Sequence, residues 1–387
     1  SVTGSALAGG FSLSEQSVSA MGTANAGRAS NAQDASVVYN NPAAMHLLKQ
    51  AQFTQAVAFI DAQTKIKNAS PSVLPGGTNE GDIVPHTFIP SGYFTSGDKG
   101  GWAWGVAAYG SYGLKTNHEA TYAARYLGDK SSVKVTTIQP TISYKVNDKV
   151  SVGFGPTINK LDAYLSKFGG PAAGQVELEG DDIGYGFNVG THINVSPATQ
   201  VGVVYRSKVK YKIDDGTLKA AAIPVTVTAS TGLSTPESVE VALSHKLNAK
   251  TTLHAGSTWT RWSRFKELAV TSTALGNSVE IFNWKDSVGY SVGVTHAVCD
   301  KLELRAGLAY DNSPVAPADR SVRLPSADRR VASIGAGYKL SPTQTIDASY
   351  TYLDEEKAEV RHAAAPAYSA DFHNRASVYG LQFTQKF

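Results

Sequence analysis

The chain has 387 residues, of which 17% are charged, and it contains 36 glycines, 18 tyrosines and one cysteine. Soluble globular proteins usually carry about 25% charged residues, so this content is low for a soluble chain. The net charge of +3, spread over interleaved acids and bases, argues against a nucleic-acid partner. The lone Cys299 cannot form an internal disulfide, and we interpret it as a small buried or turn residue.

Membrane-spanning helices are not predicted, because no stretch approaches the roughly 18 consecutive apolar residues that one needs. The mean hydropathy of −0.18 does not exclude transmembrane β-strands. Such strands alternate apolar residues toward lipid with polar residues toward the lumen, so their average hydropathy is ordinary. Alternation is therefore the informative property of this sequence.

Residues 1–50 do not alternate. Residues 14–30 are small and polar, and the next stretch carries Asp34 at a helix-start position and Pro42 at a first helical position. A segment so rich in Ala, Gly and Ser cannot bury enough surface to fold alone. We therefore predict a hatch of short helices, folded inside a lumen that residues 51–387 form.

The strand predicted over residues 101–115 contains two glycines near its end. Gly110 and Gly113 flank Ser111 and Tyr112. Glycine weakens a strand and often marks a bulge or bend, so we expect a kink here. Ordinary packing of luminal glycines is the alternative interpretation.

Later segments alternate regularly. In residues 302–310, Leu and Ala alternate with Glu, Arg and Gly, and residues 185–195 and 346–352 repeat the pattern. A soluble β-sandwich also alternates, but its small residues would not align so regularly on the polar face. Gly and Asn in register on one face favour the crowded interior of a barrel.

Turn signals divide the chain into strands. Short signals occur at residues 96–101, 146–149, 196–199, 247–250, 298–301 and 340–343. Longer segments rich in Gly, Pro or charge lie between them, near residues 67–84, 115–131, 166–182, 213–236, 273–278, 312–329 and 354–373. Short periplasmic turns that alternate with long external loops are typical of outer-membrane barrels.

Six short turns and seven long loops join fourteen strands. The predicted fold is therefore all-β, a 14-stranded antiparallel transmembrane β-barrel with a small N-terminal helical hatch in the lumen. A barrel of this size is too wide for its wall side chains to fill, but about forty residues can plug it. The last segment, residues 377–387, alternates and ends on Phe387, which resembles the signal that outer-membrane assembly machinery reads.

Catalytic and metal motifs have little support. Residues 289–293 match the G-x-S-x-G pattern, but Ser291 lies inside an alternating strand, whereas a nucleophile elbow needs a strand-to-helix turn. The nine histidines show no metal-ligand spacing. We predict no enzyme activity, no metal and no cofactor. The function classes that remain are a channel for hydrophobic substrates, a general porin and an outer-membrane lipid hydrolase.

Several blocks resemble the outer-membrane long-chain fatty acid transporters (FadL family). The segment from Gly9 to Gly27, followed by Asn41, Pro42 and Ala43, is similar to the family's N-terminal hatch. Further blocks match in order at residues 184–190, 205–211, 259–268 and 311–329. The resemblance begins at Gly9. We interpret residues 5–8, which precede it, as a signal-cleavage remnant or a short mature extension.

The resemblance implies passive uptake of long-chain fatty acids or other hydrophobic molecules across the bacterial outer membrane. It implies capture between extracellular loops, passage through the lumen and lateral release into the membrane at a kinked third strand. Lateral release is physically reasonable, because release into water would cost about 0.8 kcal/mol per exposed CH₂. The expected partners are the hydrophobic ligand, outer-membrane lipid and lipopolysaccharide, and we expect a monomer.

The resemblance also suggests site residues. Phe11 matches an aromatic residue that reaches the inner pocket, so a shift of residues 9–11 would open the path, although Phe11 could instead only anchor the hatch. The expected gate residues are Asn41, Pro42 and Ala43 of the hatch and Gly110, Ser111, Tyr112 and Gly113 of the third strand. Whether the lateral gap is open is expected to depend on how residues 41–43 pack against the third strand.

Lys167 matches the family's basic pocket residue, although it could be a solvated loop cation. The second basic position falls near Glu280, an acid. This departure leaves room for neutral ligands such as aromatic hydrocarbons. The apolar segment 218–231 is expected either to line the outer groove or to fold onto itself.

Overall fold

The computed structural model describes residues 9–273, 276–364 and 366–387, so the segment 5–8 lies outside the described residues. Within them the chain forms nineteen strands, two α-helices and three 3-10 helices. The strands are β1 (Gln52–Lys67), β2 (Thr87–Thr95), β3 (Trp102–Asn117), β4 (Lys130–Lys145), β5 (Val150–Phe168), β6 (Gln175–Asn194), β7 (Thr199–Arg206), β8 (Val209–Ala220), β9 (Ile223–Thr235), β10 (Ser238–Lys246), β11 (Thr251–Thr260), β12 (Glu267–Ser272), β13 (Gly276–Ile281), β14 (Ser287–Ala297), β15 (Leu302–Asp311), β16 (Arg329–Ser341), β17 (Gln344–Glu355), β18 (Ala358–His362) and β19 (Tyr368–Lys386).

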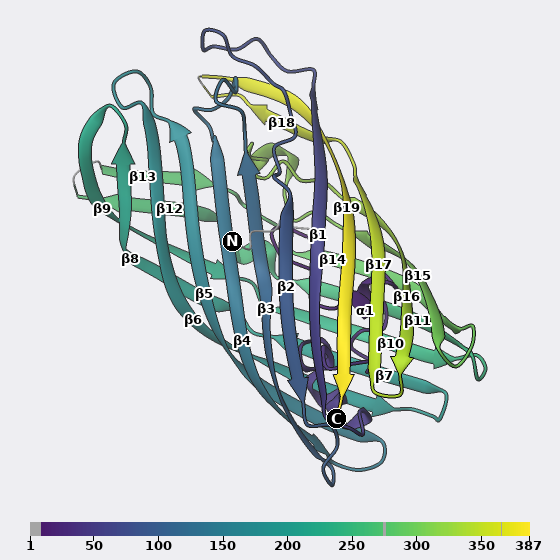
Figure 1. Ribbon diagram of the computed structural model, residues 1–387. Helices are drawn as coiled ribbons and strands as arrows, with labels where there is room; N and C mark the ends of the chain where they lie inside the picture. Colours follow the sequence, from purple (N-terminus) through teal and green to yellow (C-terminus); the bar gives the residue numbers. More distant parts are fainter. Residues whose placement is uncertain (1–8, 274–275, 365) are drawn as a thin grey trace.

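Fourteen strands form one closed antiparallel barrel (Figure 1). Around the wall, neighbours pair in the order β1, β2, β3, β4, β5, β6, β7, β10, β11, β14, β15, β16, β17 and β19. β19 then pairs with β1 from Gln52↔Lys386 to Lys67↔Asp371, which closes the ring. The predicted fourteen-stranded barrel is confirmed.

The six predicted short turns are also confirmed. They connect β2 to β3, β4 to β5, β6 to β7, β10 to β11, β14 to β15, and β16 to β17. All lie at the end of the barrel where the chain terminates, toward the bottom and lower right of Figure 1. Cys299 is an exposed residue of the β14–β15 turn, one of the two places expected for it.

The other five strands extend the wall on the side of the long loops. β8 and β9 form a hairpin, β8 pairs with the outer part of β6, and β9 meets the β12–β13 hairpin. β18 pairs with the start of β19. The segments 213–236 and 354–373, which we predicted as loops, therefore contain strands. Val and Thr residues in the first segment favour strands, and both segments find strand edges of the barrel to pair with.

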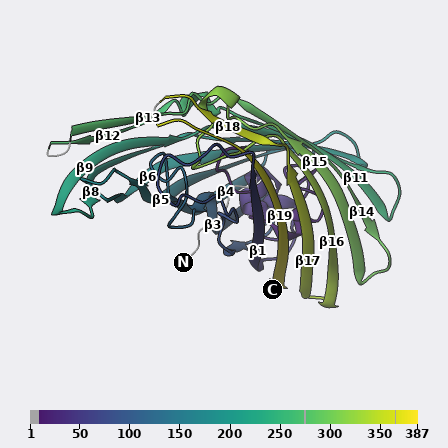
Figure 2. The ribbon, with the colours of Figure 1, turned by 90° about the horizontal axis from the view of Figure 1, so that it is seen from above.

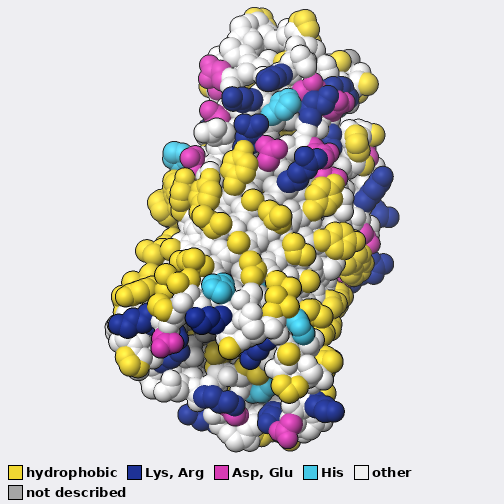
Figure 3. Space-filling model, turned by 90° about the vertical axis from the view of Figure 1, so that its right-hand side faces the viewer, with side chains coloured by type: hydrophobic (Ala, Val, Ile, Leu, Met, Phe, Trp, Pro, Cys, Tyr) yellow, Lys and Arg dark blue, Asp and Glu magenta, His cyan; other side chains and the backbone are white. Residues whose placement is uncertain are grey.

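Apolar side chains cover the outer face of the barrel. On β5 the outward residues Val152, Phe154 and Ile158 are exposed, whereas the inward Ser151, Thr157 and Asn159 are buried. Figure 3 shows a broad band of hydrophobic side chains across one side of the molecule, with charged side chains gathered toward both ends. Such a band suits contact with lipid. No helix in the described residues is long and apolar enough to span a membrane.

The N-terminal segment lies inside the ring of strands (Figure 2). It contains α1 (Val18–Met21), α2 (Val37–Asn40) and the 3-10 helix η1 (Pro42–Leu47), and Pro42 begins η1 as predicted. The other 3-10 helices, η2 (Trp262–Arg264) and η3 (Pro317–Asp319), belong to the loop side.

Wall glycines let the hatch backbone approach closely. A Cβ on Gly202 would lie 1.7 Å from the carbonyl oxygen of Ala29, and one on Gly307 would lie 2.2 Å from that of Thr23. Any side chain at these two wall positions would displace the hatch.

Candidate functional site

The wall is incomplete between β2 and β3. The described ladder between them runs only from Gly92↔Ala108 to Thr95↔Gly105, although β2 continues outward to Thr87. β3 also shifts register relative to β4 between Gly110 and Tyr112, so Ser111 is the extra residue of a bulge. The bend predicted at Gly110 to Gly113 is present.

The hatch fills this gap with backbone hydrogen bonds. The amide of Leu13 donates to the carbonyl oxygen of Ser111 at 3.1 Å, and the amide of Gly113 donates to that of Phe11 at 2.9 Å. Ser12 and Tyr112 form an isolated antiparallel bridge. Residues 11–13 therefore occupy the place beside β3 that β2 leaves open.

Phe11 lies in a cluster of aromatic rings. Its ring centroid is 4.8 Å from that of Trp262, 5.7 Å from Phe265 and 5.8 Å from Trp284. The adjacent Gly10 has φ +71°, and a Cβ there would lie 2.6 Å from the Trp262 ring. Both the backbone conformation and the close ring require glycine at this position.

An apolar pocket opens on one side of Phe11. Its volume is about 790 Å³, including the space at its open side. Aliphatic and aromatic side chains form most of its lining. They are Phe11, Leu114, Val133, Leu161, Ala163, Leu165, Leu178, Ile213, Leu233, Phe265, Leu268, Phe282, Trp284 and Leu324. From the segment 218–231, Thr231 of β9 also lines the pocket. A pocket of this size and lining suits a hydrophobic ligand.

A second cavity lies on the other side of the same hatch segment, and we call it the polar cavity because Ser, Thr, Asn and charged side chains line much of it. Gly9, Ser12 and Leu13 line it, together with Ser111 and Tyr112 of the β3 bulge. Its volume is about 1490 Å³, including the space at its open side. Residues 9–13 thus separate an apolar pocket from a polar cavity that reaches the gap in the wall.

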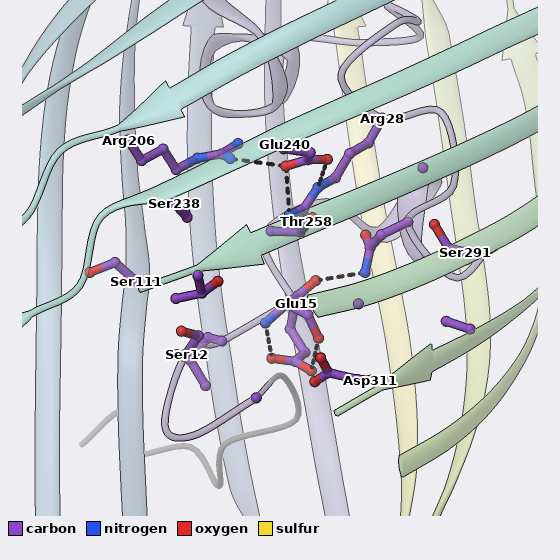
Figure 4. A pocket seen from close by; sticks show the side chains of 18 of the residues that line it. Ser12, Glu15, Arg28, Ser111, Arg206, Ser238, Glu240, Thr258, Ser291 and Asp311 are labelled. Atoms are coloured by element: carbon purple, nitrogen blue, oxygen red, sulfur yellow. Dashed lines mark hydrogen bonds and ion pairs between the residues drawn. The ribbon is translucent and has the colours of Figure 1, made fainter. Parts of the chain in front are cut away.

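Buried charges hold the hatch on the far wall of this cavity. Glu240 of β10 accepts hydrogen bonds from Arg28 at 2.7 Å and from Arg206 at 2.9 Å, and Figure 4 shows the two guanidinium groups meeting it from opposite sides. Glu15 is also buried here. Burial raises the pKa of its carboxyl, although hydrogen bonds from Ser14 partly offset this effect.

One cation, Arg323, lies in the lining of the apolar pocket. Its side chain is 7% exposed and pairs with Glu280 at 3.1 Å. It also donates to the Ser131 hydroxyl and to the Lys130 carbonyl oxygen, both at 3.1 Å. Glu280, which stands where a second cation was expected, therefore neutralises the pocket cation. We did not predict Arg323, although it lies in the matching block 311–329.

Lys167 does not line the pocket. It pairs with Val176 near the end of β5, whereas Leu165, two residues earlier on the same face, does line the pocket. β5 continues to Phe168 and carries Lys167 beyond the lining residues. The structure therefore places Arg323, and not Lys167, at the position of a pocket cation.

Asn41, Pro42 and Ala43 lie away from the β3 bulge. The side-chain Nδ2 of Asn41 donates to the carbonyl oxygens of Ala29 at 2.7 Å and Thr191 at 3.1 Å. Its Oδ1 accepts a hydrogen bond from the backbone amide of Ala43. Gly153 of β5 and Gly190 of β6 leave the space that this motif occupies. These two glycines place the motif against β5 and β6, away from the β3 bulge, although the 3-10 helix that it begins also contacts β3. The motif anchors the hatch.

No cluster of three or more His, Cys, Asp or Glu residues suited to a metal ion is found in the described parts of the chain. Ser291 lines the polar cavity from the middle of β14, inside a strand as predicted.

The sequence of this chain is similar to known outer-membrane transport proteins. The family model described as "Outer membrane protein transport protein (OMPP1/FadL/TodX)" matches residues 1–387. The long-chain fatty acid transport protein of Salmonella typhi is 26% identical over 420 residues, which cover 99% of this chain and 95% of the relative.

Two solved structures share the fold. A Pseudomonas aeruginosa FadL homologue aligns with a TM-score of 0.88 and 21% identity, covering 98% of this chain and 100% of its own. The CymD monoaromatic hydrocarbon channel aligns with a TM-score of 0.70 and 18% identity, covering 98% of this chain and 99% of its own.

Proposed function

This chain belongs to the OMPP1/FadL/TodX family of outer membrane transport proteins, and we propose that it admits long-chain fatty acids and related hydrophobic compounds by passive diffusion. It is an outer-membrane β-barrel that transports hydrophobic compounds, and it is not an enzyme. In the proposed route, the ligand enters the apolar pocket, passes Phe11 into the polar cavity and leaves sideways between β2 and β3.

One observation carries this route. The segment from Phe11 to Leu13 forms the boundary of the apolar pocket and also completes the wall beside the β3 bulge. A single displacement of this segment would therefore open both the passage between the cavities and the lateral gap. Lateral exit keeps the hydrocarbon chain away from water, which would cost about 0.8 kcal/mol per CH₂.

The family relationship and the buried cation support a fatty acid as substrate. In an apolar pocket a carboxylate needs a cationic partner, and Arg323 offers a guanidinium that can bind it through two hydrogen bonds. The carboxylate would replace Glu280 on Arg323.

A neutral hydrocarbon is the second candidate, and the Arg323–Glu280 pair favours it. Because Glu280 already occupies Arg323 at 3.1 Å, a neutral ligand can bind without breaking an ion pair. Aromatic side chains around Phe11 also provide suitable contacts for an aromatic ligand.

Displacement of a fluorescent fatty acid from the purified barrel tests this proposal. Oleate and toluene are compared as competitors against the parent chain and an Arg323→Gln/Glu280→Gln variant, which removes both charges together so that neither is left unpaired. Lys167→Gln is the matched control, since Lys167 lies outside the pocket.

For a fatty-acid transporter we expect oleate to displace the probe and to weaken about tenfold in the double variant, with Lys167→Gln unchanged. Displacement by toluene, with no change in the double variant, would identify a neutral hydrocarbon instead. Failure of both competitors would contradict the proposed pocket.

A further inference from the structure

A basic groove lies on the loop side of the barrel, apart from the transport path. It lies between the β7–β8 connection and the segment that joins β11 to β12. Its volume is about 850 Å³, including the space at its open side. Five cations and two serines line it: Lys208, Lys210, Ser234, Arg261, Ser263, Arg264 and Lys266.

The groove faces outward from the wall. Val209 and Tyr211 are buried in the same apolar cluster as Phe11, so Lys210, which alternates with them on β8, points to the opposite face. Trp262 and Phe265 are buried in that cluster too, whereas the cations around them are exposed or partly exposed. The groove is therefore open to the surroundings of the barrel.

Two carboxylates offset only part of this charge. Glu237 pairs with Arg261 at 3.2 Å and with Arg264, which holds its pKa at about 2. Asp286 accepts a hydrogen bond from the amide of Ser263 at 3.0 Å. Against five cations these two acids leave a net charge of +3. In the described chain, Lys208, Lys210 and Lys266 make no ion pair with a carboxylate.

The groove lies at the level along the barrel where lipid headgroups would surround the wall. Tyr205, Val239 and Trp259 form one row across β7, β10 and β11, and the exposed Val241 and Leu243 continue the apolar face below this row. The basic residues follow directly on the outer side of the row. Tyr and Trp at such an edge mark the boundary between hydrocarbon and headgroups.

We propose that this groove binds the phosphate groups of an outer-leaflet lipopolysaccharide. Lys and Arg are the side chains that bind phosphate best, and serine hydroxyls supply further donors. The concave arrangement of five cations suits a headgroup with more than one phosphate, while the adjacent apolar face accommodates its acyl chains. This assignment does not depend on the transported substrate.

Binding of fluorescent bis-phosphorylated lipid A to the purified barrel in detergent tests the proposal. The variant Lys208→Gln/Lys210→Gln/Lys266→Gln removes three charges but keeps both arginines that pair with Glu237. The matched control, Lys149→Gln/Lys250→Gln/Lys301→Gln, removes three exposed lysines from the short turns at the opposite end. Heat-dependent gel mobility checks that each barrel is folded.

We expect the groove variant to bind lipid A at least about tenfold more weakly, and the control to bind like the parent. Monophosphoryl lipid A should bind the parent more weakly than the bis-phosphorylated form. Equal losses in both variants would overturn the site. Competition by inorganic pyrophosphate as strong as that by lipid A would assign the groove to free phosphate. Fatty-acid displacement should stay unchanged in both variants, so the two proposals fail independently.

Discussion

Gly10 is the residue on which the position of Phe11 depends. Its φ of +71° and the 2.6 Å approach of the Trp262 ring leave no room for a Cβ. The family resemblance suggested Phe11, because the hatch block that carries it is one continuous stretch of sequence. Arg323 was not predicted, because its partner Glu280 lies 43 residues away and a single sequence does not reveal that contact.

The substitution Gly10→Ala should displace Phe11 from the aromatic cluster. We expect the affinity of the apolar pocket for a fluorescent fatty acid to fall about tenfold, since Phe11 and its neighbours line the pocket. Gly100→Ala is the matched control: Gly100 also has positive φ (+69°), but a Cβ there meets nothing within 4 Å. Equal effects of the two substitutions would show that backbone strain alone is responsible.

His118 links the β3–β4 loop to the β15–β16 loop. Its ring stacks on Tyr122 at 3.7 Å, and its Nε2 lies 3.1 Å from the carbonyl oxygen of Val322. Burial lowers the pKa of His118 to about 4. The unfolded loop therefore binds a proton more readily than the folded loop between pH 6.5 and 4, so loop stability falls as pH falls through this range.

We expect the free energy of local unfolding of this loop to fall by about 2 kcal/mol between pH 7 and pH 5. Hydrogen exchange of residues 118–129 at the two pH values measures it. His118→Gln keeps a donor for Val322 and removes the titrating group, so its loop should show little change. A parent loop that exchanges equally at both pH values would contradict the assignment to His118.

The bulged strand β3 is the element that opens the wall. Alternation and turn chemistry in the sequence predicted the barrel strands, and the glycines predicted the bend. The five extra strands β8, β9, β12, β13 and β18 were not predicted, because they form by pairing with one another and with edges that only the folded barrel supplies. The position of residues 41–43 was missed for a similar reason: it depends on the distant Gly153 and Gly190.

Deletion of Ser111 should remove the bulge. β3 and β4 would then pair without a register shift, and β3 could continue its ladder with β2. We expect fatty-acid uptake by reconstituted vesicles to fall to background while the barrel still shows heat-dependent gel mobility. Normal uptake by a folded deletion variant would show that the ligand does not leave through the gap between β2 and β3.

The hatch closes a barrel whose wall side chains cannot fill the lumen. Its backbone rests on wall glycines and its charges pair with wall residues, as Arg28 does with Glu240. We therefore expect the hatch to block ions while leaving a route for apolar ligands at one edge.

The substitution Gly202→Val should unseat the hatch, since even a Cβ would lie 1.7 Å from the Ala29 carbonyl oxygen. We expect a several-fold increase in ion conductance across planar bilayers. Gly92→Val, at a wall position where a Cβ meets nothing within 4 Å, should conduct like the parent. Unchanged conductance in a folded Gly202→Val barrel would show that the hatch is not the barrier to ions.

Uptake with residues 11–13 locked to β3 tests directly whether this hatch segment must move for the ligand to pass. Ser12 and Tyr112 form an antiparallel bridge, so cysteines at both positions, in a Cys299→Ser background, suit a disulfide. A second disulfide, between Ser30→Cys and Ser244→Cys, ties the hatch to β10 away from the gap, where the two hydroxyls are 2.8 Å apart. We expect oxidation to stop fatty-acid uptake in the first variant but not in the second, and reduction to restore it. Undiminished uptake by the oxidised Ser12→Cys/Tyr112→Cys barrel would show that the ligand passes without movement of residues 11–13.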